Sequence, residues 1–111
     1  MKYKVIIQPP ALADIEGAYR YIHERAPTRA PDWLDKLYEA MESLEELPKR
    51  CSRAPESNEV GQDIRQMLYG KRGGVYRVLF VVLDDQVRIL HVRHAAREFL
   101  KPDEIALPPA P

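Results

Sequence analysis

Cysteine is nearly absent from this chain of 111 residues, in which Cys51 stands alone. A single cysteine cannot form a disulfide within the chain, and such a sequence is typical of reducing compartments. Long hydrophobic runs are also missing. The apolar run in the opening MKYKVIIQPP is too short for a signal peptide, and no other stretch approaches a membrane span. We therefore expect a cytoplasmic protein with no membrane partner.

The chain also lacks the residue patterns of the common cofactor and catalytic sites. No glycine-rich phosphate loop or nucleophile elbow occurs, and GKRGG precedes an apolar run as a hairpin turn would. Zinc needs three or four ligands. His91 and His94 lie three positions apart, which would put them on opposite faces of a strand, so the two side chains would not bind one ion together. Arg50 and Arg53 would lower the pKa of the Cys51 thiol, but a lone loop cysteine is more often incidental. We expect no metal and no cofactor.

A net charge of one sign is missing as well, because 17 basic residues balance 17 acidic ones. The two signs are nevertheless segregated. Residues 11–47 hold nine acidic and four basic side chains, whereas residues 62–101 hold eight basic and four acidic ones. The basic C-terminal half is compatible with an anionic partner. The content of 45% hydrophobic and 31% charged residues fits one globular domain with a two-layer core.

Residues 3–25 predict a strand followed by a helix. The run YKVIIQ has β-type composition and ends at Pro9 and Pro10, which cannot donate to a sheet and suit the first turn of a helix. From residue 11 to about residue 25, apolar side chains recur every three or four positions, as on an amphipathic helix. These side chains are Leu12, Ile15, Tyr19 and Ile22.

A second helix is expected after the break APTRAP. Thr28 is a suitable cap, and Pro31 is tolerated in the first turn, where backbone amides have no helical partner. The helix then runs to about Leu47 and ends before Pro48. Its apolar stripe consists of Leu34, Leu37, Met41 and Leu44. Together the two helices predict an antiparallel helical hairpin.

The second half of the chain predicts a connection, three strands and a tail. Residues 49–62 are polar and lack periodicity. Three strands follow, separated by the turns GKRGG and DDQ. They are Asp63–Tyr69, Gly74–Leu83 and Gln86–His94. The Pro-rich end PDEIALPPAP is expected to fray or to be held by a partner.

This order of elements predicts an α+β fold with the plan β-α-α-β-β-β. A helical hairpin would pack on one face of a small antiparallel sheet and leave the other face open. Residues 1–98 would form this single domain and residues 99–111 a C-terminal tail. Strict alternation along the last strand puts Val87, Ile89, His91 and Arg93 on one face and Arg88, Leu90, Val92 and His94 on the other.

Cations collect on the predicted strands and turns in numbers that a core would not tolerate. Arg77 lies within the apolar run VYRVLFVV, so that it must be paired or functional if it is buried. On an open face such side chains form a concave basic surface, where arginines clamp phosphates and a histidine acts as acid or base in RNA cleavage. Alternatively, they only solvate the sheet and pair with nearby carboxylates, namely Asp63, Asp84, Asp85 or Glu98. The basic set is Arg65, Lys71, Arg72, Arg77, Arg93, His94 and Arg97.

Several motifs follow one another along the chain. The first half carries the pattern Y-x-V-x-x-x-P-x-A-x-x-D-I-x-x-x-Y-x-Y-I from Tyr3 to Ile22, followed by APTRAPDWLDKL. The second half carries DIRQMLYG, YRVLFVV and VRILHVRHAARE. In order and spacing these motifs resemble the RelE/ParE superfamily of toxins from type II toxin–antitoxin modules, from about Tyr3 to Glu98. The resemblance implies a RelE/ParE-like fold and a cognate antitoxin that wraps the toxin in a hetero-oligomer.

The resemblance implies one of two activities. RelE-like toxins cut messenger RNA on the ribosome without a metal, by means of basic groups on the sheet, whereas ParE-like toxins poison DNA gyrase. For RNA cleavage, the resemblance makes Arg77 in YRVLF and Arg97 in HAARE catalytic candidates, with His94 as a substitute acid or base. Arg65 in DIR fits an arginine that many members carry in the first C-terminal strand.

The departures from the RelE pattern favour the ParE-like activity. Leu68 and Gly70 stand where RelE-like sequences carry a pair of lysines. Asp103 stands where they carry a catalytic tyrosine, and the nearby Phe99 has no hydroxyl for proton transfer.

We therefore interpret the chain as the toxin of a type II module, with inhibition of DNA gyrase as the preferred function. A RelE-like endoribonuclease, with ribosome and messenger RNA as partners, is the alternative. A non-toxic family member that only binds antitoxin is a third hypothesis. Target or antitoxin contacts are predicted at Arg65, Lys71, Arg72, Arg77, Arg93 and Arg97.

Overall fold

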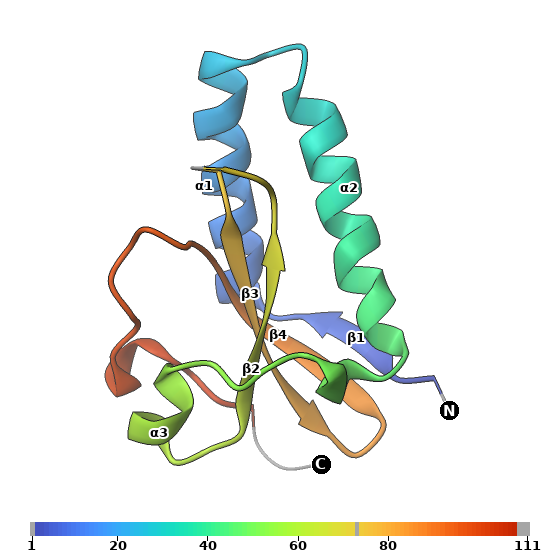
Figure 1. Ribbon diagram of the computed structural model, residues 1–111, viewed down its shortest axis with the longest axis vertical. Helices are drawn as coiled ribbons and strands as arrows, with labels where there is room; N and C mark the ends of the chain where they lie inside the picture. Colours follow the sequence, from blue (N-terminus) through green and yellow to red (C-terminus); the bar gives the residue numbers. More distant parts are fainter. Residues whose placement is uncertain (1, 73, 109–111) are drawn as a thin grey trace.

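The computed structural model describes residues 2–72 and 74–108, and it confirms the predicted α+β plan. Two helices follow the first strand, and three strands complete the sheet (Figure 1). The elements are β1 (Lys4–Ile7), α1 (Pro9–Arg25), α2 (Ala30–Glu42), α3 (Glu56–Val60), β2 (Ile64–Tyr69), β3 (Tyr76–Leu83) and β4 (Gln86–His94). Residues 109–111, at the end of the predicted tail, lie outside the described residues.

The four strands form one sheet in the order β1-β4-β3-β2. β2 pairs with β3 and β3 with β4 in antiparallel fashion, as predicted, whereas β1 pairs in parallel with β4 and places Val5 opposite Val87. The sheet is therefore mixed rather than wholly antiparallel. β1 takes an edge, which suits a strand whose continuation at Pro9 and Pro10 offers no backbone donor.

Both helices differ at their ends from the sequence prediction. α1 begins at Pro9, and α2 begins at Ala30 with Arg29 rather than Thr28 in the N-cap position. α2 ends at Glu42 and gives way to a 3₁₀ turn. Leu47, the predicted helix end, has a left-handed backbone with φ of 47°, which no right-handed helix can continue through.

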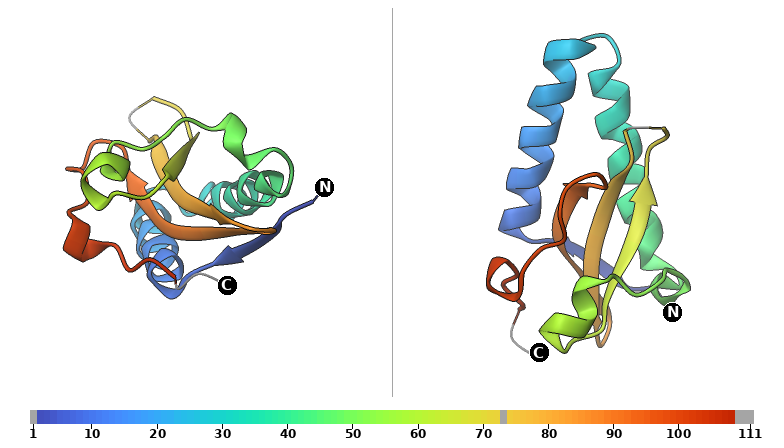
Figure 2. Two further views of the ribbon diagram at one scale, coloured as in Figure 1. Left: turned by 90° about the horizontal axis from the view of Figure 1, so that it is seen from below. Right: turned by 60° about the vertical axis from the view of Figure 1, so that its left-hand side comes forward.

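The main core lies between the helical hairpin and the sheet. Along β3, the side chains of Tyr76, Val78 and Phe80 point towards the helices, as the alternation predicted. α1 contributes Ala11 and Ile15, and α2 contributes buried apolar side chains of its predicted stripe. The hairpin rises beyond the end of the sheet, so that its far turn stands clear of the strands (Figures 1 and 2).

The opposite face of the sheet is covered as well, so the expectation of an open face is wrong. A second cluster joins Ile64, Leu79, Val81 and Leu90 of this face to Ala54, which precedes α3, and to Leu100 and Ile105. The covering segment, residues 99–107, is named the C-terminal strap from here on. It runs across the sheet beside α3 (Figure 2), and the burial of Ile105 shows that this part of the predicted tail is not frayed.

A bulge in β4 explains why strict alternation failed there. The register between β3 and β4 shifts between Leu79 and Phe80, since Leu79 pairs with His91 and Phe80 with Ile89. One extra residue moves the later side chains to the other face. Val92 therefore joins Ile89 in the helix-side core, while Leu90 enters the second cluster.

None of the helices in the described part of the chain has the length and apolar content needed to span a bilayer.

Candidate functional site

Arg77, the central member of the predicted basic set, is buried and paired. Its side chain leaves β3 on the face opposite the helices, and the residue is only 4% exposed. Nη1 and Nη2 donate to the two carboxylate oxygens of Glu56 at 2.9 and 2.7 Å, and Nη1 also donates to Oε1 of Gln66 at 3.0 Å. The Phe99 ring lies 5.3 Å from its guanidinium carbon. Arg77 is therefore enclosed in a two-point ion pair rather than displayed on a surface.

Glu56 holds three elements together. It lies at the start of α3, accepts from Arg77 on β3, and accepts the Leu100 backbone N–H of the C-terminal strap at 3.0 Å. Burial acts to raise the pKa of Glu56, but the hydrogen bonds from Arg77 and Leu100 outweigh it and hold the pKa below its ordinary value. The carboxylate therefore stays ionised and keeps the buried arginine neutralised.

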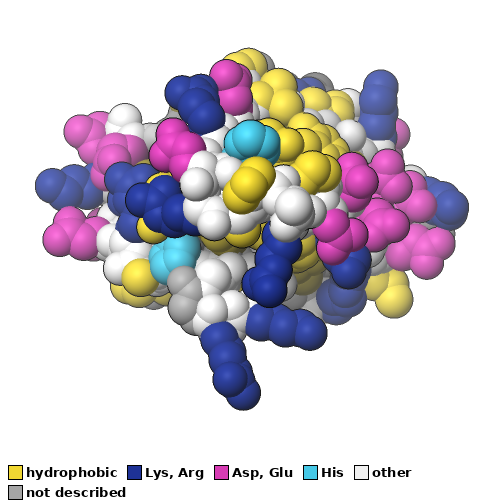
Figure 3. Space-filling view, turned by 90° about the horizontal axis from the view of Figure 1, so that it is seen from above, with side chains coloured by type: hydrophobic (Ala, Val, Ile, Leu, Met, Phe, Trp, Pro, Cys, Tyr) yellow, Lys and Arg dark blue, Asp and Glu magenta, His cyan; other side chains and the backbone are white. Residues whose placement is uncertain are grey.

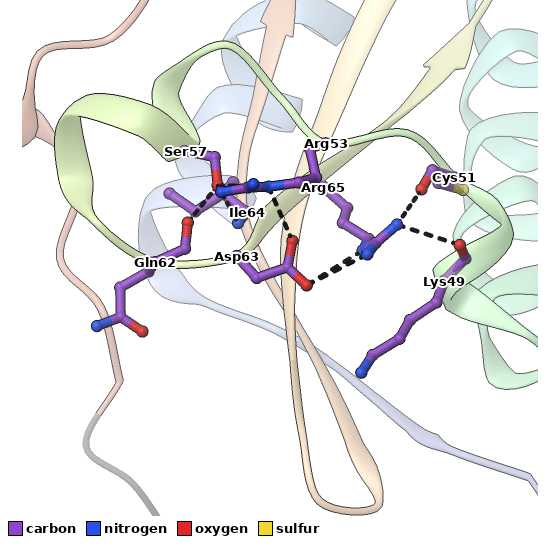
Figure 4. A network of polar contacts seen from close by, with 8 residues as sticks. All are labelled: Lys49, Cys51, Arg53, Ser57, Gln62, Asp63, Ile64 and Arg65. Carbon is purple, nitrogen blue, oxygen red and sulfur yellow. Dashed lines mark hydrogen bonds and ion pairs between the residues drawn. The ribbon is translucent and has the colours of Figure 1, made fainter.

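Arg65 also has a structural position. Figure 4 shows its guanidinium between Asp63, 3.3 Å away, and the backbone of the connection before α3. Nη1 donates to the carbonyl oxygens of Lys49 and Cys51 at 3.1 and 2.8 Å. Arg65 thus tethers that connection to the edge strand β2. The pairing with Asp63 is one of those that the sequence left open as an alternative to function.

The segment around Arg65 is fixed further by Ser57 (Figure 4). Its hydroxyl donates to the Gln62 carbonyl and accepts the Ile64 N–H at 3.0 Å, while Arg53 donates to it at 2.8 Å. Burial raises the pKa of the nearby Cys51 thiol, against the opposing effect of Arg50 and Arg65. The expectation of a lowered thiol pKa is therefore wrong, because burial dominates.

The remaining members of the basic set gather at one end of the sheet, named the basic end. It consists of Lys71, Arg72, Arg93, His94 and Arg97. A backbone hydrogen bond of 2.8 Å from Ala95 to Val75 joins the turn after β4 to the start of β3, which brings the two turns together. Viewed from above, dark-blue side chains project at the lower edge of the molecule, while carboxylates gather at its left and right (Figure 3). Lys71, Arg72 and Arg97 are exposed.

Arg93 and His94 are half-buried at this end and partly held by the backbone. Arg93 Nε donates to the Glu98 carbonyl at 2.8 Å, and His94 Nδ1 accepts the Ala96 N–H at 3.1 Å. The His94 ring meets the Tyr76 ring edge-on at a centroid distance of 5.1 Å. The basic end can therefore present cations to an anionic surface, with Arg93 and His94 shaping the turn behind them.

An aromatic cluster, which sequence reasoning missed, supports the basic end from the helix side. The Trp33 ring on α2 lies 5.9 Å from Tyr69 and 5.4 Å from Tyr76, and the Tyr69 hydroxyl donates to the Trp33 carbonyl at 2.6 Å. These contacts fix α2 against this end of β2 and β3. Tyr76 belongs to the main core, and Trp33 and Tyr69 pack against it.

His91 is a polar residue whose role the sequence did not indicate. Nδ1 lies 2.8 Å from Oδ2 of Asp14 on α1, and Nε2 lies 3.1 Å from the Glu104 carbonyl oxygen. Asp14 Oδ2 also accepts the Val92 N–H at 3.0 Å, beyond the point where β1 stops pairing with β4. The hydrogen bond to Asp14 raises the pKa of His91 above its ordinary value, against the effect of burial.

Within the described ranges, no group of three or more His, Cys, Asp or Glu side chains is arranged to hold a metal ion. His91 contacts Asp14 and the C-terminal strap, whereas His94 packs on Tyr76. The two histidines therefore serve separate contacts.

The comparisons with known proteins agree with this fold. A family model described as the ParE toxin of the type II toxin–antitoxin system parDE matches residues 5–99. The structure is similar to a solved chain described as the chromosomal ParDE TA system from P. aeruginosa. The TM-score is 0.67 at 15% sequence identity, over 84% of this chain and 96% of that one. At this identity the structural likeness concerns the fold alone. No curated protein matches the chain.

Proposed function

This chain belongs to the ParE family of toxins from type II toxin–antitoxin systems, and from that membership we propose that it acts by inhibiting DNA gyrase. The proposal makes it a binding poison rather than an enzyme. The observation that carries it over RNA cleavage is the position of Arg77, the arginine that a ribosome-dependent nuclease would need at the scissile phosphate.

A guanidinium can stabilise a phosphoryl transition state only if it reaches the phosphate. Both terminal nitrogens of Arg77 are engaged by Glu56, and the side chain is 5% exposed. To contact RNA, Arg77 would have to leave a carboxylate that is itself buried, and that step would strand an unpaired charge. Asp103, in the position of the catalytic tyrosine by resemblance, offers a carboxylate instead of a phenol.

We place the contact with gyrase at the basic end. Lys71 and Arg72 precede β3, and Arg97 follows β4, so that three exposed cations come from two adjacent turns. Exposed cations of this kind steer association with a negatively charged surface and set its salt dependence. Arg93 and His94 belong to the same proposed surface as supporting residues.

The second proposed partner is a cognate antitoxin, by analogy with the ParDE system that the fold resembles. Antitoxin segments that order on binding would neutralise the toxin by covering its basic end. The toxin and its antitoxin would then form a hetero-oligomer in which gyrase cannot reach these cations.

The experiment is a comparison of supercoiling by purified gyrase with cleavage of messenger RNA on translating ribosomes, each with the toxin added at a series of concentrations. We expect loss of supercoiling, intact RNA, and recovery when antitoxin is added. Arg97→Ala should weaken gyrase inhibition several-fold. Arg20→Ala, which removes an exposed arginine paired with Glu16 on α1, is the matched control and should have no effect.

The remaining outcomes overturn the proposal in different ways. Codon-positioned cuts in RNA, with supercoiling intact, would establish the endoribonuclease. Tight antitoxin binding without either activity would establish a non-toxic family member. Equal loss of inhibition in Arg97→Ala and Arg20→Ala would move the gyrase contact away from the basic end.

A further inference from the structure

The C-terminal strap is held on the sheet by apolar packing and by hydrogen bonds to its backbone. Its buried apolar anchors are Leu100 and Ile105. Between the strap and α3 lies a hollow of about 600 Å³, lined by Pro55, Glu59 and Phe99 among others. The strap therefore touches the body of the protein at separate points rather than along its whole length.

Two of these points are hydrogen bonds to the strap backbone, and each involves a charged side chain. The Leu100 N–H donates to Glu56, and the Glu104 carbonyl faces Nε2 of His91 at 3.1 Å. Each of the two side chains is also bonded to a counterion on another element, Glu56 to Arg77 on β3 and His91 to Asp14 on α1. The strap is thus bonded at Leu100 and at Glu104 to two charged pairs of the body.

The two hydrogen bonds to the strap backbone differ in how they depend on the protonation of the side chain. Nδ1 of His91 faces a carboxylate oxygen of Asp14, and Nε2 faces a carbonyl oxygen, so both partners can only accept. A neutral imidazole carries one N–H and can satisfy only one of them, leaving a lone pair against the other oxygen. Only the imidazolium donates to both. The geometry therefore requires a proton on each ring nitrogen while the strap is closed.

The charged groups around His91 come from three elements. Asp14 on α1 favours the protonated ring, whereas Arg93 on β4 opposes it. On the strap, the Glu104 carboxylate accepts the Lys101 N–H at 2.9 Å, and Lys101 and Asp103 are exposed. β3 places the apolar Leu79 opposite His91. Asp14 is the anion in direct contact, and its effect prevails: the pKa of His91 is raised.

We propose that the C-terminal strap is a proton-dependent latch, which His91 closes when its ring is protonated on both nitrogens and releases when it loses a proton. On deprotonation the imidazole keeps Nδ1–H on Asp14 and gives up the Glu104 carbonyl. Residues 101–107 then lift from the sheet, while the hydrogen bond from Leu100 to Glu56 remains.

Opening the latch changes which surface the protein presents. Ile105, in the part that lifts, belongs to the apolar cluster that contains Leu79 and Leu90, and Arg93 of the basic end donates to the Glu98 carbonyl just before the strap. Lifting would expose an apolar patch next to the basic end. This regulation concerns the chain itself, and it holds whether or not gyrase is the target.

The test is amide hydrogen exchange of the strap in the full-length chain, measured by NMR from pH 5.5 to 8.5 and corrected for intrinsic exchange. We expect the protection of Glu104 and Ile105 to fall about tenfold as pH rises through the His91 titration, the change that corresponds to one charge-assisted hydrogen bond. Protection in β3 should stay constant. In His91→Gln, strap protection should be low and independent of pH. His23→Gln, in the last turn of α1, is the matched control and should behave as the parent chain.

Two results would overturn the latch. One is strap protection in the parent chain that is flat across the pH range, and the other is the same pH dependence in His91→Gln. If that variant does not fold, ¹⁵N spectra of the parent chain decide. At pH 5.5 both ring nitrogens of His91 must be protonated, and on deprotonation Nε2 must be the nitrogen that loses its proton. Loss from Nδ1 instead would exclude the mechanism.

Discussion

Arg77 and Glu56, 21 positions apart in the chain, form a two-point ion pair on the sheet face opposite the helical hairpin, with N–O distances of 2.9 and 2.7 Å. The pair joins the start of β3 to α3, and through the Leu100 N–H it also reaches the C-terminal strap. Arg77 Nε has no hydrogen-bond partner among the described residues. Glu56 therefore binds two of the three guanidinium nitrogens, Nη1 and Nη2. Arg77, which the sequence required to be paired or functional if buried, is thus paired, and the pair connects three parts of the interior.

Removing either partner of this pair should be strongly destabilising. Glu56→Ala leaves a buried guanidinium without a counterion and the Leu100 N–H without an acceptor, and we expect a loss of about 3–5 kcal/mol in the free energy of unfolding. Glu59→Ala, an exposed acid on the same short helix, should cost less than about 0.5 kcal/mol. Chemical denaturation of both variants measures the difference.

The same pair allows a sharper check. Replacing both residues by apolar ones, in Arg77→Met with Glu56→Leu, removes both charges together and should recover most of the stability lost in the single variant. A double variant as unstable as Glu56→Ala would show that the loss comes from packing rather than from an unpaired charge.

Local patterns in the sequence predicted most of the helix-side core, although Leu12 of the predicted stripe is exposed and Ala11 is buried in its place. The three- and four-residue spacing on α1 and α2 and the alternation at Tyr76, Val78 and Phe80 each reflect one element packing against one face. Such signals depend only on near neighbours in the chain. They therefore predicted the order of elements and the hairpin correctly.

The second cluster, on the sheet face opposite the helices, could not be predicted in the same way, because it depends on contacts between distant segments. The bulge that separates Leu90 from Val92 arises where β3 and β4 pair, and a short polar stretch gave no period for α3. The alternation did show that Arg77 must be paired or functional if buried. The partner, Glu56, lay in a segment expected to be an irregular connection, so the basic set appeared more exposed than it is.

Asp14 should control the protonation of His91, and the effect on stability has a definite sign. A raised folded-state pKa gives stabilisation that is complete below the ordinary histidine pKa, near 6.5, and is lost as pH rises through the folded value. Asp14→Asn should lower the His91 pKa and cost about 1–3 kcal/mol at pH 6. The loss in the free energy of unfolding should become smaller towards pH 9. The part that remains there reflects the weaker hydrogen bond that the Val92 N–H makes to a neutral amide in place of the Asp14 carboxylate.

The measurement for Asp14→Asn is the free energy of unfolding at several pH values from 5.5 to 9, together with the His91 ring proton shifts. Asp32→Asn, which removes an exposed acid paired with Lys36 on α2, is the control and should leave both unchanged. A deficit of the same size at every pH would mean that Asp14 acts only as a backbone acceptor.

Leu47 combines a strained backbone with an exposed side chain. Its φ of 47° lies in the left-handed region, and 77% of the residue is exposed. Glycine adopts this conformation without a steric cost, and little packing is lost, so Leu47→Gly should raise the free energy of unfolding by about 1 kcal/mol. Leu12→Gly, at an exposed position inside α1, should lower it by about the same amount. Thermal unfolding of the two variants should shift in opposite directions, and a shared decrease would argue against strain at Leu47.

Cys51 should react slowly with thiol reagents in the folded protein. Burial raises the pKa of the thiol, so the thiolate fraction near neutral pH is smaller than in an unfolded chain, where the side chain is hydrated. We expect iodoacetamide to modify the folded protein several-fold more slowly than the urea-unfolded protein at pH 8. As pH is raised further, the rate should level off in the unfolded protein while it is still rising in the folded protein. Faster modification in the folded protein than in urea would mean that Arg50 and Arg65 outweigh burial and that Cys51 is an activated thiol.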